Sequence, residues 1–427
     1  MARVVVIGAG PMGLAAAHRA VTLGHQVDLV EADAKAGGMA AHFDFGGVSI
    51  ERFYHFCCLS DQPTFDLMEE LGLGGKMRWV KTSMSYYMGG KVHRWGDPVS
   101  LLRFPHLSLW EKLRYGLQVF VTTRKNDFNS IEPLTSREWI ERGAGRSVYA
   151  KLWKRLQDLK FYEYADRVSA SWIATRIRRI GRSRAGLFEE RLGYIEGGSE
   201  TLVEALAEAI VAKGGQIHLK TPAERIVCTD GRVSAVQAGG RLFPADHVIS
   251  TIPTPLISAL VPDLPATARA MYDDIDNIGC VCVLLRLRRS VSPHFWMNIV
   301  DPSIDIPGII EFSNLRPLGG DAFVYVPYYM PTSQPKWTWS DASFVEEAFG
   351  YIKVINPQLT DADLVDARVG RLKYAQPVCE PNFREKLPPV QTDIDGLQIA
   401  DTCFYYPEDR GIAESIRFGR RMAEAVS

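Results

Sequence analysis

The first 31 residues contain the feature that most constrains the fold of this chain: a strand, a glycine-rich turn, a helix and a second strand in direct succession. Arg3 to Ile7 is rich in β-branched apolar residues, the pattern of a strand buried on both faces. Leu14 to Leu23 reads as an alanine-rich helix, and His25 to Val30 as a second strand, followed by Glu31. The turn between the first strand and the helix comprises Gly8, Ala9, Gly10, Pro11, Met12 and Gly13. This order predicts a βαβ unit.

The spacing of the three glycines predicts a dinucleotide-binding turn. Gly8 permits a tight turn, Gly10 lets the backbone approach a pyrophosphate, and Gly13 lets the helix pack closely on the strand. The helix that begins here directs free N–H groups and the positive end of its dipole at the phosphates. Glu31 stands at the end of the second strand, where an acid accepts hydrogen bonds from ribose hydroxyls.

The segment after Glu31 favours FAD over NAD. Residues 31–40, EADAKAGGMA, resemble the loop that follows the ribose acid in FAD-dependent amine oxidases, protoporphyrinogen oxidases and phytoene desaturases. The resemblance implies that Gly37 and Gly38 bring the backbone onto the diphosphate and ribityl chain of FAD. It implies cofactor contacts at Glu31, Ala32, Lys35, Gly37, Gly38 and Met39. A plain surface loop is the alternative.

Further segments resemble the same superfamily, in the same order along the chain. Residues 221–226, TPAERI, resemble the strand that faces adenine, with Ala223 at the contact position. Residues 396–401, GLQIAD, resemble the C-terminal strand whose acid, Asp401, meets the ribityl and pyrophosphate region. Gly411 and Ile412 resemble the start of the last helix, which lies beside the flavin ring and stabilises negative charge on it.

The resemblance implies an α/β fold with a discontinuous Rossmann-type FAD-binding domain, a mixed-sheet substrate domain and a helical insert. We expect the FAD-binding domain to comprise residues 1–91, 192–271 and 379–427. Residues 92–191 would form the helical insert of the substrate domain, and residues 272–378 its β-rich part. A chain of 427 residues is long enough for more than one domain.

Three residues are candidates for catalysis. His55 follows the FAD loop, in a segment that passes near the flavin ring in this superfamily, and it could move a proton at neutral pH. Arg410 directly precedes Gly411 and could hold an anionic group of the substrate or the flavin itself. Tyr374 is expected to form an aromatic wall over the ring with Tyr328 and Tyr329. A core histidine, a Glu–Arg pair on a loop and ordinary core aromatics are the alternatives.

One expected residue is absent. Amine oxidases of this superfamily usually carry a lysine on the strand that matches Gly279 to Leu287, where it holds a water near flavin N5. The segment here, GCVCVLLRL, has no lysine, which counts against amine oxidation.

Charge and cysteine content narrow the partners and the compartment. The 49 basic residues nearly cancel the 50 acidic ones, so we expect no nucleic-acid partner. The seven scattered cysteines lack metal-ligand spacing and indicate reduced thiols, and we expect no metal site and a cytoplasmic location. No signal peptide and no apolar run long enough to cross a bilayer is visible.

The segment 101–125 combines apolar, aromatic and basic residues. We expect a helix from Leu101 to Thr122, with Arg103, Lys112, Arg114, Arg124 and Lys125 beside its apolar residues. Such a face suits peripheral contact with a membrane, as the helical inserts of protoporphyrinogen oxidases and carotenoid desaturases provide. A helical cap packed on the second domain is the alternative.

These features predict an FAD-dependent oxidoreductase that transfers a hydride to flavin N5 from a hydrophobic or lipid-linked small molecule. One alternative is a non-redox flavoenzyme of the UDP-galactopyranose mutase type, for which Arg52, Arg176 and Arg410 could supply the basic pocket. A flavin-dependent scaffold without turnover is the other. The electron acceptor and the oligomeric state are left open.

Overall fold

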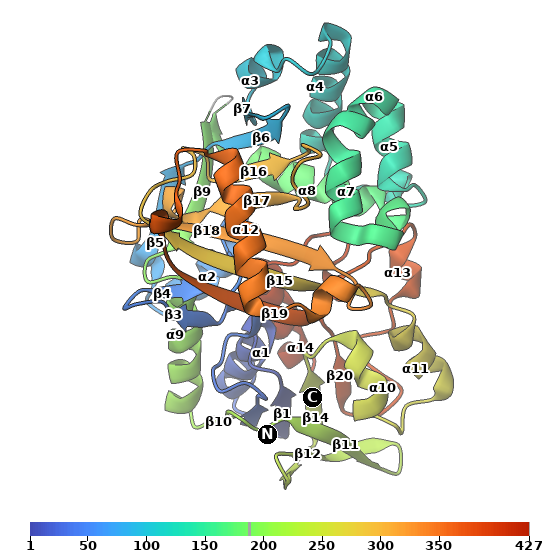
Figure 1. Cartoon of the computed structure of the whole chain (residues 1–427). Coiled ribbons are helices and arrows are strands. Elements are labelled where there is room, and N and C mark those ends of the chain that lie inside the picture. Colours follow the sequence, from blue (N-terminus) through green and yellow to red (C-terminus); the bar gives the residue numbers. More distant parts are fainter. Residues whose placement is uncertain (187–188, 427) are drawn as a thin grey trace.

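The computed structural model describes residues 1–186 and 189–426. A parallel five-stranded sheet lies at the end of the molecule that carries both termini (Figure 1). Its strands come from distant parts of the sequence and hydrogen-bond in the order β10 (Gln216–His218), β2 (Gln26–Val30), β1 (Arg3–Ile7), β14 (His247–Ser250) and β20 (Leu397–Ile399). The central strands are apolar because helices and loops cover both faces.

The first and last helices of the chain pack against each other on this sheet. They are α1 (Pro11–Thr22) and α14 (Ile412–Glu424), and α9 (Ser199–Ala212) packs on α1 from another side. Gly419 makes the close approach possible, because a Cβ there would lie 2.1 Å from the carbonyl oxygen of Met12. Through this packing, α14 and the glycine turn before α1 belong to the same half of the molecule.

A second, mixed sheet of seven strands builds the other half of the molecule. Its order is β19 (Leu364–Pro377), β15 (Asn277–Leu287), β18 (Ala322–Met330), β17 (Gly308–Glu311), β16 (Trp296–Ile299), β6 (Met84–Met88) and β7 (Lys91–Trp95). Helix α12 (Asp341–Ile355) crosses one face, as Figure 1 shows. Side chains alternate along β18, so that Tyr325 and Tyr329 share the core with the five-stranded sheet, whereas Tyr328 lies under α12.

The hairpin β6–β7 belongs to this second sheet. Met84 to Tyr87 pair in parallel with Trp296 to Ile299. The structure therefore places the hairpin residues 84–91, which we expected in the FAD-binding domain, in the seven-stranded sheet.

The helical insert lies beyond this sheet, at the top of Figure 1. It comprises α3 (Pro98–Arg103), α4 (Leu109–Arg124), α5 (Ser136–Gly143), α6 (Arg146–Val148), α7 (Lys154–Phe161) and α8 (Ala170–Arg182). The single helix expected from Leu101 to Thr122 is wrong. It is broken between α3 and α4, because Pro105 has no N–H to donate and disfavours helical geometry at Phe104, and Ser108 then caps α4 in a box with Glu111.

Smaller elements complete the chain. The short strands are β3 (His42–Asp44), β4 (Ser49–Glu51), β5 (Met77–Lys81), β8 (Arg184–Gly186), β9 (Glu189–Ile195), β11 (Ala223–Thr229), β12 (Arg232–Ala238) and β13 (Arg241–Pro244). The remaining helices are α2 (Gln62–Glu70), α10 (Ile257–Leu260), α11 (Ala266–Asp273) and α13 (Phe383–Lys386).

Candidate functional site

The glycine turn after β1 presents bare backbone at the start of α1. Gly8 has φ +100°, and a Cβ on Gly13 would lie 1.8 Å from the carbonyl oxygen of Gly8, so both positions require glycine. A Cβ on Gly10, in contrast, would meet nothing within 4 Å. Gly10 therefore borders open space, which leaves room for a ligand on its backbone.

The loop with Gly37 and Gly38 folds back onto this turn. The N–H of Gly37 donates to the carbonyl of Ala9 at 2.8 Å. A Cβ on Gly38 would lie 3.1 Å from the Cα of Gly10. Two glycine segments, whose contacting residues are 28 positions apart in the sequence, thus form one backbone surface.

Glu31 lies at the rim of this surface. Its carboxylate accepts hydrogen bonds from the N–H of Ala9 at 2.7 Å and from the N–H of Asp33 at 2.8 Å. Ala32 and Lys35 follow it and are exposed, and Met39 is half-buried.

The donors at this surface fit a pyrophosphate. The first hydrogen bond within α1 joins the N–H of Leu14 to the carbonyl of Gly10 at 2.9 Å, so the amides of Met12 and Gly13 precede the helical ladder. Pro11, at the first helical position, has no N–H to leave unpaired. Free amides and open space at Gly10 together suit a dinucleotide.

The C-terminal candidates lie on elements next to this turn. Asp401 follows β20, at the same carboxyl edge of the sheet, where it is buried. Its carboxylate accepts from the N–H groups of Cys403 at 2.8 Å and Thr254 at 2.6 Å, and burial raises its pKa. Gly411 caps α14 and Ile412 begins it, both half-buried, and Ala223 begins β11.

His55 is half-buried and held by its own chain. Its Nδ1 lies 2.7 Å from the carbonyl oxygen of Phe53, which can only accept, so Nδ1 carries the proton. Burial lowers the pKa of His55 to about 4. The ring is therefore neutral at pH 7, and its Nε2 is a proton acceptor.

Arg410 joins two tyrosines from different segments. Its guanidinium donates to the carbonyl of Ala375 and, at 3.1 Å, to the hydroxyl of Tyr329. The hydroxyls of Tyr329 and Tyr54 lie 3.2 Å apart. Burial raises the pKa of Tyr329 to about 12, so this network holds neutral phenols beside a cation.

The three tyrosines expected in an aromatic wall do not lie together on one face. Tyr328 faces away from this network, with its ring 5.0 Å from that of Phe344 on α12, so its expected place in the wall is wrong. The strand period of two explains this, since neighbours on β18 point to opposite faces. Tyr374 is half-buried on β19, and its ring lies 5.1 Å from the ammonium of neighbouring Lys373. The described contacts do not join Tyr374 to Arg410.

Lys160 is a site residue that sequence reasoning missed. Its ammonium lies 4.7 Å from the ring centroid of Tyr329, 5.0 Å from that of Trp172 and 3.5 Å from the amide oxygen of Gln376. Burial, reinforced by Arg176 and Arg410, lowers its pKa well below the usual range. One lysine among several on an amphipathic insert gives no sequence signal, because only the packing of α7 against β18 brings it here.

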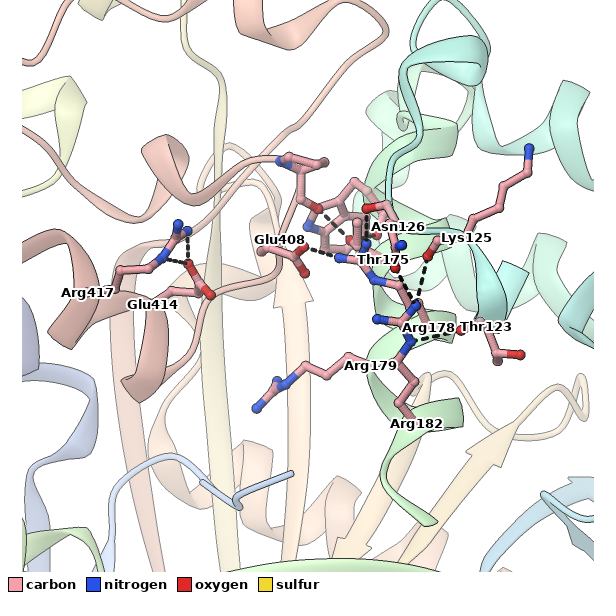
Figure 2. Close-up of polar contacts among 12 residues, drawn as sticks. Thr123, Lys125, Asn126, Thr175, Arg178, Arg179, Arg182, Glu408, Glu414 and Arg417 are labelled. Carbon is pink, nitrogen blue, oxygen red and sulfur yellow. Dashed lines mark hydrogen bonds and ion pairs between the residues drawn. The ribbon is translucent and has the colours of Figure 1, made fainter. Parts of the chain in front are cut away.

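Helix α8 fixes the loop that leads into α14, as Figure 2 shows for Thr175 and Arg178. Arg178 pairs with Glu408, and Thr175 donates to the carbonyl of Pro407. Arg176 pairs with Asp409 at 2.7 Å. The loop that ends in Arg410 is therefore positioned by the helical insert rather than by the five-stranded sheet alone.

Comparison with known proteins yields one family and several relatives. Residues 13–352 match the model of the flavin containing amine oxidoreductase family. A 15-cis-phytoene desaturase from an Oncidium hybrid cultivar is 24% identical over 281 residues, which are 61% of this chain and 48% of the desaturase. The match spans about half the length of this relative and 69% of a 15-cis-phytoene desaturase from Arabidopsis thaliana, which is 22% identical over 404 residues.

Two solved structures share the fold over the whole chain. A protein described as a protoporphyrinogen oxidase, from Exiguobacterium sp. 255-15, superposes with a TM-score of 0.77 at 19% identity, covering 99% of this chain and 98% of the other. A reduced UDP-galactopyranose mutase gives a TM-score of 0.76 at 17% identity, covering 100% and 95%.

Proposed function

We propose that this chain, which belongs to the family of flavin-containing amine oxidoreductases, is an FAD-dependent oxidoreductase acting on a hydrophobic or lipid-linked substrate. The observation that carries FAD is the double glycine surface at the start of α1, with Glu31 at its rim. Gly8 to Gly13 would hold the pyrophosphate, Glu31 a ribose, and Gly37 and Gly38 the extended diphosphate chain. When bound, the flavin supplies a hydride acceptor at N5.

The protein's own residues would orient the substrate and exclude water. Tyr54 packs edge-on against Trp296 at 5.4 Å and lies 5.8 Å from Tyr325, so the network around Arg410 has aromatic walls. The first turn of α14 would direct its positive dipole end at negative charge on the cofactor. The unprotonated Nε2 of His55 would accept the proton that leaves the substrate.

Aromatic walls favour an apolar substrate. Phe56, half-buried next to His55, adds edge-on contacts with Phe295 at 5.6 Å and with Trp296 at 6.4 Å. The relatives named 15-cis-phytoene desaturase support removal of hydrogen from a hydrocarbon chain rather than from an amine.

We propose in addition that α4 contacts an anionic membrane surface. Its outer face exposes the apolar side chains of Leu109, Trp110, Leu113, Leu117, Phe120 and Val121, with exposed fractions from 43% to 68%. Next to this face a groove of about 560 Å³ is lined by apolar side chains and by the cations Arg114, Lys125 and Arg142. Apolar ridges flanked by cations suit lipid headgroups of negative charge. No described helix is long and apolar enough to cross a membrane.

Cofactor content tests the FAD proposal directly. Gly10→Val would fill the space above the turn, so we expect the purified variant to lose its flavin absorbance while it stays folded. Gly75→Val is the matched control, because a Cβ at exposed Gly75 also meets nothing within 4 Å. Chromatography of the released cofactor identifies it. Full FAD occupancy in Gly10→Val would contradict our placement of the pyrophosphate.

Anaerobic spectroscopy tests the redox proposal. Phytoene and polyprenyl lipids in detergent are added to the oxidised holoenzyme, and dithionite serves as the control for full reduction. If the protein is an oxidoreductase, one of these substrates reduces the flavin and bleaches its absorbance. A holoenzyme that none of them bleaches, but that converts a sugar nucleotide once dithionite has reduced it, would instead be a mutase, which the cations Arg176 and Arg410 would suit.

A further inference from the structure

Two half-buried cations lie against one tyrosine ring beside the start of α14. The ammonium of Lys160 lies 4.7 Å from the ring centroid of Tyr329, and the guanidinium carbon of Arg410 lies 5.5 Å from it. The two residues come from the helical insert and from the loop before α14, so the tertiary fold alone brings them together. Both side chains are half-buried and keep some accessible surface.

Neither cation is paired with a carboxylate within the described residues. Arg410 donates to a backbone carbonyl and a phenol, and Lys160 approaches the amide oxygen of Gln376 at 3.5 Å. The carboxylate whose field reaches both is Asp409, and it accepts a hydrogen bond from Arg176. Asp409 thus lies in the field of four cations, Arg176, Lys160, Arg410 and Arg179, of which Arg179 is paired with Asp61.

This excess of positive charge calls for an anion. Removing a cation from water is unfavourable unless an opposite charge or several hydrogen bonds compensate. A lysine can release its proton, and burial together with Arg176 and Arg410 lowers the pKa of Lys160. Arg410 cannot do the same, because a guanidinium stays charged in proteins. A second anion beside Asp409 would satisfy both cations.

We propose that Lys160 and Arg410 form a subsite for an oxyanion of the substrate, a carboxylate or a phosphate ester, placed against the Tyr329 ring. This rests on the proposed function, since it puts the subsite beside the first turn of α14, where the flavin ring is expected. The substrate would therefore be amphipathic. Its apolar body would contact the aromatic walls, and its anionic end would lie between Lys160 and Arg410.

Calorimetry on the oxidised holoenzyme tests this with small aromatic anions. The probes are benzoate and phenyl phosphate, and benzamide is the neutral analogue. We expect at least one anion to bind and benzamide to bind at least tenfold more weakly, because a charge-assisted hydrogen bond contributes about that factor. The tighter of the two anions identifies carboxylate or phosphate ester as the class.

Variants on α7 assign the binding to Lys160. Lys160→Met should weaken binding of the anion by about tenfold or more, and Lys160→Arg should restore much of the affinity. Lys154→Met is the matched control, since exposed Lys154 on the same helix pairs, among the described residues, with Asp158 alone. Equal affinity in Lys160→Met and the unsubstituted protein, or equal binding of benzamide, would overturn the proposal.

The pH dependence gives a second readout. The titratable groups that face Lys160 are Arg176, Arg410, Asp409, Cys280, Cys379 and Tyr329. Because the anion needs the ammonium form, its affinity should fall as the pH rises through the lowered pKa of Lys160, and this fall should be absent in Lys160→Arg. A pH profile unchanged by Lys160→Arg would also overturn the proposal.

Two outcomes separate this proposal from the redox proposal. Anions that bind while no candidate substrate reduces the flavin would end the redox proposal and keep the subsite. Anions that fail to bind the oxidised holoenzyme, with Lys160→Met altering only the flavin reduction potential, would show that these cations serve the reduced flavin, and the subsite would be wrong.

Discussion

At the scale of single residues, burial decides the protonation of His55. Its pKa in the folded chain is about 4, below the ordinary 6.5. Between these pH values His55 is protonated in the unfolded chain and neutral in the folded chain. The free energy of unfolding therefore falls as the pH drops from about 6.5 to about 4. For a half-buried ring the effect is of order 1–3 kcal/mol.

We predict that His55→Gln removes this pH dependence. Other histidines also titrate, so the measured quantity is the difference in free energy of unfolding between the unsubstituted protein and the variant, from urea titrations at pH 8 and pH 4.5. Relative to the unsubstituted protein, the variant should be more stable at pH 4.5 than it is at pH 8. A difference that is the same at both pH values would mean that His55 titrates normally in the folded protein.

At the scale of elements, helix α8 connects the end of α4 with the loop before α14. Arg178 donates to the carbonyl of Asn126 at 2.7 Å and pairs with Glu408 (Figure 2). Arg182 donates to the carbonyls of Thr123 at 2.8 Å and Lys125 at 3.1 Å, and its described contacts do not reach the loop. The two arginines therefore provide a matched pair of variants.

We predict that Arg178→Ala speeds amide hydrogen exchange both near residues 125–126 and in the loop 407–411. Arg182→Ala should speed exchange only at the end of α4. The loop opens more readily in Arg178→Ala because a half-buried charge-assisted pair, contributing about 1 kcal/mol or more, is lost there. Equal exchange of the loop in both variants would contradict a role for Arg178 in holding it.

Elements with a clear local sequence pattern could be predicted from the sequence. The glycine turn, the strands around it and the last helix are correctly predicted because each has its own periodicity and turn residues. The helix expected from Leu101 to Thr122 was wrong because its composition is helical throughout, while Pro105 interrupts it. Lys160 had no local signal, since its surroundings come from α8, β18 and β19.

At the scale of the whole molecule, the expected superfamily and α/β fold are confirmed. The order of segments along the chain led us to predict a discontinuous nucleotide-binding domain, and the five-stranded sheet combines strands from separated parts of the chain. The strand order of the second sheet could not be predicted, because β6 pairs with β16 across more than 200 residues and nothing local encodes that choice. The placement of the predicted cofactor and catalytic residues remains a prediction.

The exposed face of α4 leads to the last prediction. Leu113, Leu117 and Phe120 are more than half exposed, so replacing all three by Ser should leave folding intact and weaken binding to vesicles. Each substitution removes an apolar side chain whose burial in a bilayer contributes of order 1 kcal/mol to binding. The triple variant should therefore bind at least about tenfold more weakly.

Co-sedimentation with phosphatidylserine-containing vesicles measures this effect. Val211→Ser with Leu242→Ser, which alters two equally exposed side chains far from the insert, should bind as the unsubstituted protein does. Added salt should weaken binding further, because Arg114, Lys125 and Arg142 are screened from the headgroups. If the unsubstituted protein stays out of the pellet with anionic vesicles, the exposed face of α4 has another partner, since exposure of six neighbouring apolar side chains would otherwise favour association.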